Sequence, residues 1–146
     1  MVARFIAIAV LVSVHEYGHF WAARKCGIKV HRFSIGFGKV IWKRIDKHGT
    51  EFAVSMIPLG GYVKMLDGRN EAVPVEQKPQ AFDSKSVLQR AFVIISGPLA
   101  NFIFAIFAYW AIYLYGMPSV KPVIESITPS SIAAQAHIEP NTQILA

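Results

Sequence analysis

Two long apolar stretches dominate the pattern of hydrophobic and polar positions along this chain. The first runs from Phe5 to Ala23, and the second, from Ala91 to Met117, contains no charged residue. A helix of about 20 residues spans roughly 30 Å, which is the thickness of the hydrocarbon core of a bilayer. The pattern therefore predicts two transmembrane helices, at residues 1–24 and 91–117.

Between these stretches, the apolar residues come in short β-branched and aromatic runs that glycines interrupt. Residues 30–35, 39–45 and 50–57 are typical of strands, and Asp-Lys-His-Gly at residues 46–49 is typical of a hairpin turn. The apolar, glycine-rich residues 57–65 are expected to form a hairpin that dips into the membrane. An ordinary β-meander outside the membrane is the alternative.

The remaining segments are polar. Residues 68–81 are expected to be irregular, and Asp83 or Ser84 is expected to cap a short amphipathic helix that leads into the second span. After the second span, residues 118–146 have the composition of a soluble domain, with a predicted strand at 122–127 and a helical turn at 131–136.

The predicted fold is an α-helical membrane protein with a β insert, which occupies residues 25–90. Apolar residues make up 53% of the chain, and all of the 15 Lys and Arg except Arg4 and Lys121 lie between Arg24 and Arg90. By the positive-inside rule, the insert faces the cytoplasm, and the N-terminus and residues 118–146 lie on the opposite side. Acidic residues alternate with these cations, which argues against nucleic-acid binding.

The residues that carry chemistry are His15, Glu16 and His19, inside the first apolar stretch. Two histidines four residues apart share one face of a helix, so their imidazoles can converge on one ion, usually zinc. Glu16 is placed to take a proton from water that the ion has acidified. Counted from the helix end at Arg24, His19 and His15 lie about 7 and 13 Å below the cytoplasmic surface. Water must therefore reach them through a protein-lined cavity.

Two further sets of residues are candidates for substrate contact. An unpaired strand edge can hold a peptide in extended form, which points to five residues of the predicted hairpin. They are Pro58, Leu59, Gly60, Gly61 and Tyr62. Asn101 is the one amide side chain of the second span, and it could contact an oxyanion or substrate carbonyl, or simply bond to a neighbouring helix.

Four segments carry distinctive motifs. They are His-Glu-Tyr-Gly-His-Phe-Trp at 15–21, Arg-Phe-Ser-Ile-Gly-Phe-Gly at 32–38, Ile-Pro-Leu-Gly-Gly-Tyr-Val-Lys-Met at 57–65 and Gly-Pro-Leu-Ala-Asn-Phe at 97–102. Together they resemble the site-2 protease family of intramembrane zinc peptidases. The resemblance implies a bacterial inner-membrane enzyme that cuts single-pass membrane proteins, such as anti-sigma factors, within or near their spans.

The resemblance also implies roles for particular residues. His15 and His19 would be zinc ligands, Glu16 the base, and residues 51–65 a re-entrant β-hairpin that receives substrate. The family's third ligand is an aspartate in a Leu-Asp-Gly motif on a later membrane helix, which is expected beyond residue 146. Leu-Asp-Gly at residues 66–68 has the same letters, but its charged neighbours place Asp67 in a polar turn.

Residues 118–146 resemble the opening of a periplasmic PDZ domain. His137 and Asn141 stand where such domains commonly have glycine, and Thr142 stands where they have aspartate. We expect this chain to be an incomplete fragment that supplies two of three zinc ligands and is inactive alone. The alternative to an endopeptidase is a non-catalytic, zinc-containing membrane adaptor that presents a PDZ domain.

Overall fold

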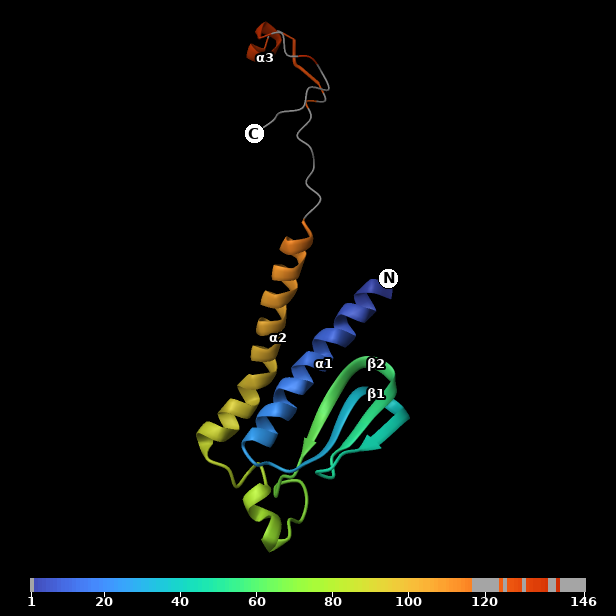
Figure 1. Cartoon of the computed structure of the whole chain (residues 1–146), viewed down its shortest axis with the longest axis vertical. Helices are drawn as coiled ribbons and strands as arrows, with labels where there is room; N and C mark the ends of the chain where they lie inside the picture. The colour runs from blue at the N-terminus through green and yellow to red at the C-terminus, as the bar shows by residue number, and fades with distance from the viewer. Residues whose placement is uncertain (1, 117–123, 125, 130, 137–138, 140–146) are drawn as a thin grey trace. The chain divides into compact units, whose positions relative to one another are not determined.

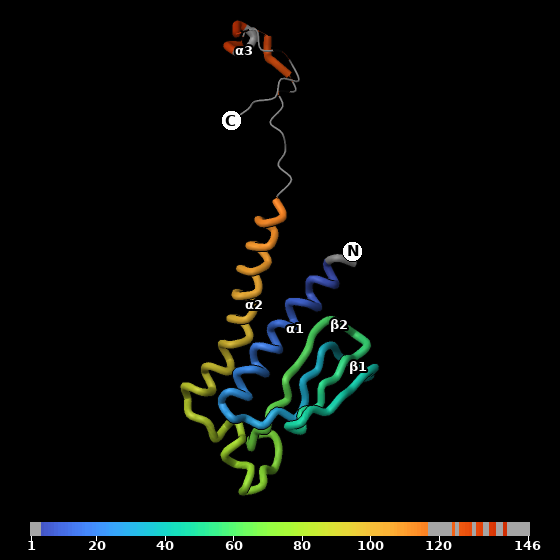
Figure 2. The backbone as a smooth tube through the Cα atoms, viewed as in Figure 1, coloured from blue at the N-terminus to red at the C-terminus, as the bar shows by residue number. Residues whose placement is uncertain are grey.

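The computed structural model describes residues 2–116, 124, 126–129, 131–136 and 139. Its elements are α1 (Val2–Lys25), β1 (Val30–Ile45), β2 (Glu51–Met65), the 3-10 helix η1 (Val75–Gln80), α2 (Val87–Tyr115) and α3 (Ile132–Gln135). Figures 1 and 2 follow these elements along the chain. By length and composition, α1 and α2 can each cross a membrane, in agreement with the two predicted spans.

The chain divides into two compact units, residues 1–109 and 110–146, and the site described below lies in the first. In the second unit, α3 coincides with the helical turn predicted at residues 131–136. In the predicted strand at 122–127, residues 124, 126 and 127 are described and are not in a strand. Residues 122, 123 and 125, and His137, Asn141 and Thr142, lie outside the described residues. The PDZ domain therefore stays a prediction.

The end of α1 is set by Gly27. This residue has a φ of 65°, a left-handed conformation that glycine adopts without steric cost. The N–H of Gly27 donates to the carbonyl of Arg24 at 3.0 Å, and the N–H of Ile28 donates to that of Ala23 at 2.9 Å. This pair of bonds is the Schellman motif, which satisfies the last carbonyls of a helix and turns the chain sharply into β1.

The two antiparallel strands are longer than the sequence predicts, because both bend and continue. β1 bends at Gly36 and Gly38, whose φ values of 88° and 85° are costly for any residue with a Cβ atom. Residues 32–35 pair with residues 61–64 on one side and with residues 51–54 on the other. The first half of β1 therefore lies between the two halves of β2.

Residues 57–65 are not a hairpin of their own, as predicted, but the second half of β2, and residues 51–65 form a hairpin only together with β1. The sequence prediction ended that strand at Ile57 because proline and two glycines follow, and these residues usually interrupt strands. Pairing with β1 outweighs this local preference.

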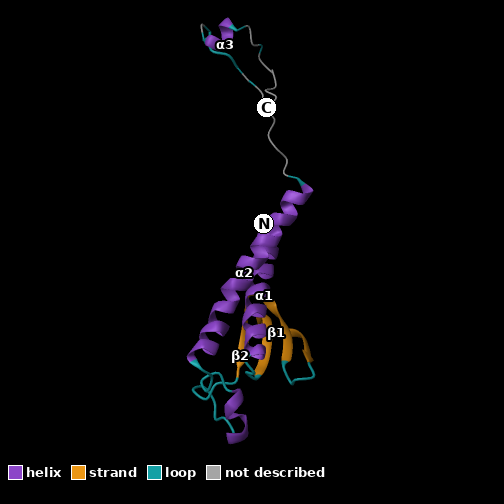
Figure 3. Ribbon diagram, turned by 60° about the vertical axis from the view of Figure 1, so that its left-hand side comes forward, coloured by secondary structure: helices purple, strands orange, loops and turns teal. Residues whose placement is uncertain are grey.

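Figures 1 and 3 show that α1 lies between α2 and the sheet, so one helix contacts both.

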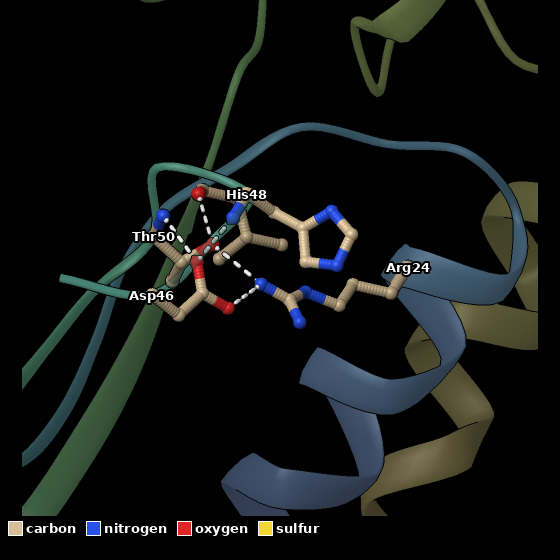
Figure 4. Close-up of polar contacts among 5 residues, drawn as sticks. Arg24, Asp46, His48 and Thr50 are labelled. Carbon is tan, nitrogen blue, oxygen red and sulfur yellow. Dashed lines mark hydrogen bonds and ion pairs between the residues drawn. The ribbon is translucent and has the colours of Figure 1, made fainter.

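The hairpin turn at residues 46–49 is confirmed, and Asp46 ties it to α1 (Figure 4). One carboxylate oxygen accepts the N–H groups of His48 and Thr50, both at 2.9 Å, and the other accepts a hydrogen bond from Arg24. Burial alone would raise the pKa of Asp46, but these hydrogen bonds lower it below its ordinary value. The contact fixes the turn of the hairpin at the end of α1 and so sets the direction in which β2 runs along that helix.

The start of α2 differs from the prediction. Asp83 does not cap it, because its carboxylate accepts the N–H of Gly68 at 3.0 Å. The cap is Ser86, whose hydroxyl accepts the N–H of Gln89 while the Gln89 side chain accepts the N–H of Ser86, a reciprocal capping box. The predicted amphipathic helix is therefore the first turn of α2, and the polar segment before it, predicted to be irregular, contains η1.

A small aromatic core joins α1 to the sheet. The rings of Phe20, Phe33 and Phe52 lie with their centroids 5.3 to 5.5 Å apart, and the guanidinium of Arg24 lies 4.5 Å above Phe20. Such aromatic pairs contribute roughly 0.5–1.5 kcal/mol each beyond their buried area. Most large apolar side chains of α2 are exposed instead, which suits contact with lipid.

Candidate active site

The two histidines of the motif converge as predicted. The Nε2 atoms of His15 and His19 lie 3.2 Å apart, and the ring planes are nearly perpendicular, at 84°. Two nitrogens bound tetrahedrally to one zinc ion, each at about 2.0–2.1 Å, are separated by about 3.3 Å. The two imidazoles therefore fit a shared zinc ion without a change in the helix.

His19 is oriented by α2. Its Nδ1 lies 2.7 Å from the carbonyl oxygen of Val93, which can only accept, so the ring proton is on Nδ1. The lone pair is consequently on Nε2, the nitrogen that faces His15. A ligand histidine normally has such a partner for its second nitrogen, because the partner fixes the tautomer and the direction of the ring.

The contact with Val93 depends on a close approach of the two helices. A Cβ atom at Gly97 would lie within 3 Å of the His19 ring, 2.6 Å from Cε1 and 2.8 Å from Cδ2. On α1, a Cβ atom at Gly18 would collide with the carbonyl of Ser96 and lie 2.9 Å from the Cβ of Ala100. The small residues on the facing sides of α1 and α2 thus leave room for the imidazole, and small residues are common where membrane helices pack closely.

Asn101 lies one turn beyond Gly97, on the same face of α2. Its Nδ2 is 3.5 Å from Nδ1 of His15. The structure therefore brings this predicted residue to the site. Its contact with His15 was not predicted from the sequence.

Glu16 faces the sheet. A Cβ atom at Gly61 would lie 2.9 Å from Cγ of Glu16 and 2.8 Å from the carbonyl oxygen of Ser34, so the backbone of β2 rests directly against the glutamate. Glu16 and His19 both line a cavity of about 590 Å³. The carboxylate thus has access to a space large enough for water and for part of a peptide.

The cavity runs along the second half of β2 to the polar segment that follows it. Its wall comprises Glu16, His19, Tyr62, Val63, Lys64, Met65, Asp67, Asn70, Glu71, Phe82, Val93 and Ile94. Because Lys64 and Asn70 are exposed, the cavity reaches the surface of the charged insert. This is the kind of protein-lined path that the sequence analysis requires for water.

The five predicted substrate-contact residues are not equivalent. Tyr62 lines the cavity, and its hydroxyl accepts a hydrogen bond from Arg32 at 3.2 Å. Gly61 touches Glu16, but a Cβ atom at Gly60 would meet the ring of Phe37 instead, 2.7 Å from Cζ. Pro58 and Leu59 are exposed and are not part of the cavity wall.

Asp67 is engaged elsewhere. Its carboxylate accepts hydrogen bonds from the guanidinium of Arg69, the shortest at 2.6 Å, and these lower the pKa of Asp67. Within the described part of the chain, no group of three His, Cys, Asp or Glu side chains is arranged to hold a metal ion. Those residues therefore contribute two imidazoles and no third ligand.

The sequence analysis missed three contributions from α2: the Val93 carbonyl, the space at Gly97, and the contact of Asn101 with His15. Their spacing of four residues is a signal that could have found them, because positions 93, 97 and 101 share one helical face. When residues spaced by four on a second membrane helix include glycine and asparagine, they indicate the face of that helix that is turned toward a polar site.

Comparison with known proteins agrees with this geometry. The profile of Peptidase family M50 matches residues 3–143, almost the entire chain. The chain belongs to this family. Membership in M50, the site-2 protease family, confirms the resemblance found in the sequence.

Several relatives of this M50 chain are closely similar. The "Regulator of sigma E protease" of Haemophilus influenzae is 94% identical over 140 residues, covering 96% of this chain and 32% of the relative. A Pasteurella multocida protein, named as a zinc metalloprotease, is 74% identical over 97% of this chain and 32% of its own length. The Escherichia coli "Regulator of sigma-E protease RseP" is 58% identical, over 97% of this chain and 31% of its own length. The chain spans about a third of the length of these relatives.

We expect Gly97→Ala to displace the His19 ring, because the new methyl group would occupy the position of the imidazole. The purified full-length variant should bind zinc at least about 10-fold more weakly, as expected when a ligand loses its orienting partner. A weaker helix would not explain this loss, since alanine is favoured over glycine by about 1 kcal/mol in a helix interior. Zinc affinity equal to that of the parent protein, measured by chelator competition, would contradict the prediction.

Proposed function

We propose that this chain carries the zinc-binding core of an intramembrane metalloendopeptidase that cuts single-pass membrane proteins of the anti-sigma-factor type. The observation that carries the proposal is the convergence of two imidazoles and one glutamate at a cavity walled by a β-strand. Membership in a peptidase family and zinc in the names of relatives support the same chemistry.

His15 and His19 would hold the zinc ion through their Nε2 atoms. The ion, when bound, lowers the pKa of water and polarises the scissile carbonyl. Catalytic zinc usually has three protein ligands and one open position, so a third ligand is needed besides these two. Because the chain spans about a third of its relatives, we propose that this ligand belongs to the remainder of the full-length protein.

Glu16 is the proposed general base. Its carboxylate takes a proton from the attacking water and delivers it to the nitrogen of the leaving amine, so that the peptide bond is replaced by an acid and an amine. The position of Glu16 at the cavity and against the backbone of Gly61 supports this role. The cavity then serves as the path for water to a site at membrane depth.

The second half of β2 is the proposed substrate clamp. Residues 61–64 pair with β1 on one side, and the cavity runs along the residues of the same segment. A substrate added to this strand would be held in extended form by backbone hydrogen bonds, with its peptide bonds facing Glu16 and the histidines. A transmembrane helix must unwind to bind in this way, which would favour substrates whose spans form weak helices.

The proposed location is the bacterial inner membrane. The basic insert, residues 25–90, would face the cytoplasm, and the N-terminus and the segment from residue 118, proposed to begin a PDZ domain, would face the periplasm. The distribution of Lys and Arg supports this orientation. The exposed apolar faces of α1 and α2 support contact with the lipid bilayer.

We expect Glu16→Gln to abolish cleavage by the full-length protein while zinc binding and folding are retained. Loss of a general base should reduce the rate by about 10²- to 10⁴-fold. Glu76→Gln, which changes an exposed carboxylate of η1 in the same way, is the matched control and should cleave at the normal rate. Normal cleavage by the Glu16 variant would refute the assignment of Glu16 as the general base, and a parent protein that binds zinc but does not cleave would favour the adaptor.

Gly61→Ala should impair cleavage without removing zinc. The added methyl group would push β2 away from Ser34 and Glu16, and a displacement of about 1 Å can cost roughly 10²-fold in rate. Gly49→Ala is the control: nothing lies within 4 Å of its Cβ, and its positive φ of 78° adds a backbone strain that Gly61→Ala does not have. The clamp proposal fails if both variants cleave equally well, as judged by kcat/KM on a membrane-protein substrate.

A further inference from the structure

The side chain of Asn101 leaves one polar atom unexplained. Its Oδ1 is buried and receives no hydrogen bond from any residue that the structure describes, while its Nδ2 lies 3.5 Å from Nδ1 of His15. A buried acceptor without a donor costs about 1–3 kcal/mol, so such an atom usually marks a function or an alternative arrangement.

The requirements of His15 point to an arrangement that gives Oδ1 a donor. For Nε2 of His15 to offer a lone pair to an ion shared with His19, the ring proton must be on Nδ1. A protonated Nδ1 needs an acceptor, and the Asn101 amide is its neighbour. Rotation of that amide by 180° exchanges its nitrogen and oxygen, and places Oδ1 where Nδ1–H of His15 can donate to it.

We propose that Asn101 is a positioning residue that accepts the Nδ1–H of His15 through Oδ1 and thereby directs the lone pair of His15 toward the ion. The arrangement would match that of His19, whose Nδ1 donates to the Val93 carbonyl from the same face of α2. One helical face thus sets both tautomers. This inference rests on the proposed zinc site and goes beyond it by assigning the acceptor of His15.

The proposal differs from an oxyanion role in the atom that acts. Stabilising an oxyanion requires the donor Nδ2, whereas positioning His15 requires the acceptor Oδ1. Asn101→Asp keeps an acceptor and removes the donor, and Asn101→Leu removes both while keeping the number and branching of the side-chain heavy atoms. Comparison of these two variants therefore separates the roles.

The experiment measures zinc affinity by chelator competition on the full-length protein in detergent. We expect Asn101→Leu to weaken binding about 10- to 100-fold, the usual effect of losing the partner of a ligand histidine. Asn101→Asp should bind within a few-fold of the parent protein. Ile106→Ala, an exposed truncation on the same helix, is the control and should change nothing. If the leucine variant does not fold, Asn101→Ala replaces it.

Two results would overturn the assignment. One is unchanged zinc affinity in the leucine and alanine variants, whether or not cleavage is lost. The other is an aspartate variant that binds zinc as weakly as the leucine variant. Neither result resembles failure of the zinc site itself, in which the parent protein would bind no zinc.

Discussion

The structure depends on one constraint: polar side chains placed in an apolar helix must each find a partner inside the protein. His15, Glu16 and His19 belong to a helix that is long and apolar enough to span a bilayer, where lipid offers no hydrogen bonds. Their partners come from the elements that pack on either side of α1. On one side α2 provides a carbonyl, a glycine gap and an amide, and on the other the glycine backbone of β2 packs against the side chain of Glu16.

The bent sheet is the second part of this solution. A straight hairpin would end where the predicted strand ends, at Ile57, and would leave Glu16 uncovered. Because β1 turns at Gly36 and Gly38, and β2 continues to Met65, the last part of β2 returns along α1. The Schellman turn at Gly27 and the contact between Arg24 and Asp46 fix this sheet to the end of the helix. The cavity beside Glu16 follows from that attachment.

The sequence alone was sufficient for the two helices, the hairpin turn and the convergence of the histidines, because each depends on local spacing. It was not sufficient for residues 57–65, since their strand conformation comes from pairing with β1 and not from their own preferences. The cap at Ser86 was misplaced for a related reason: Asp83 is an equally good cap in sequence, but Gly68 occupies it. The partners of His15 and His19 are long-range contacts, which spacing suggests only after the packed face of α2 is known.

The most direct test of the account is the zinc X-ray absorption spectrum of the full-length protein, compared with those of His15→Ala and His19→Ala. The account predicts two imidazole nitrogens at about 2.0–2.1 Å in the parent protein, with oxygen completing the coordination, and one imidazole in each variant. Sulfur neighbours, or an imidazole signal that neither substitution reduces, would show that zinc binds elsewhere and would contradict the account.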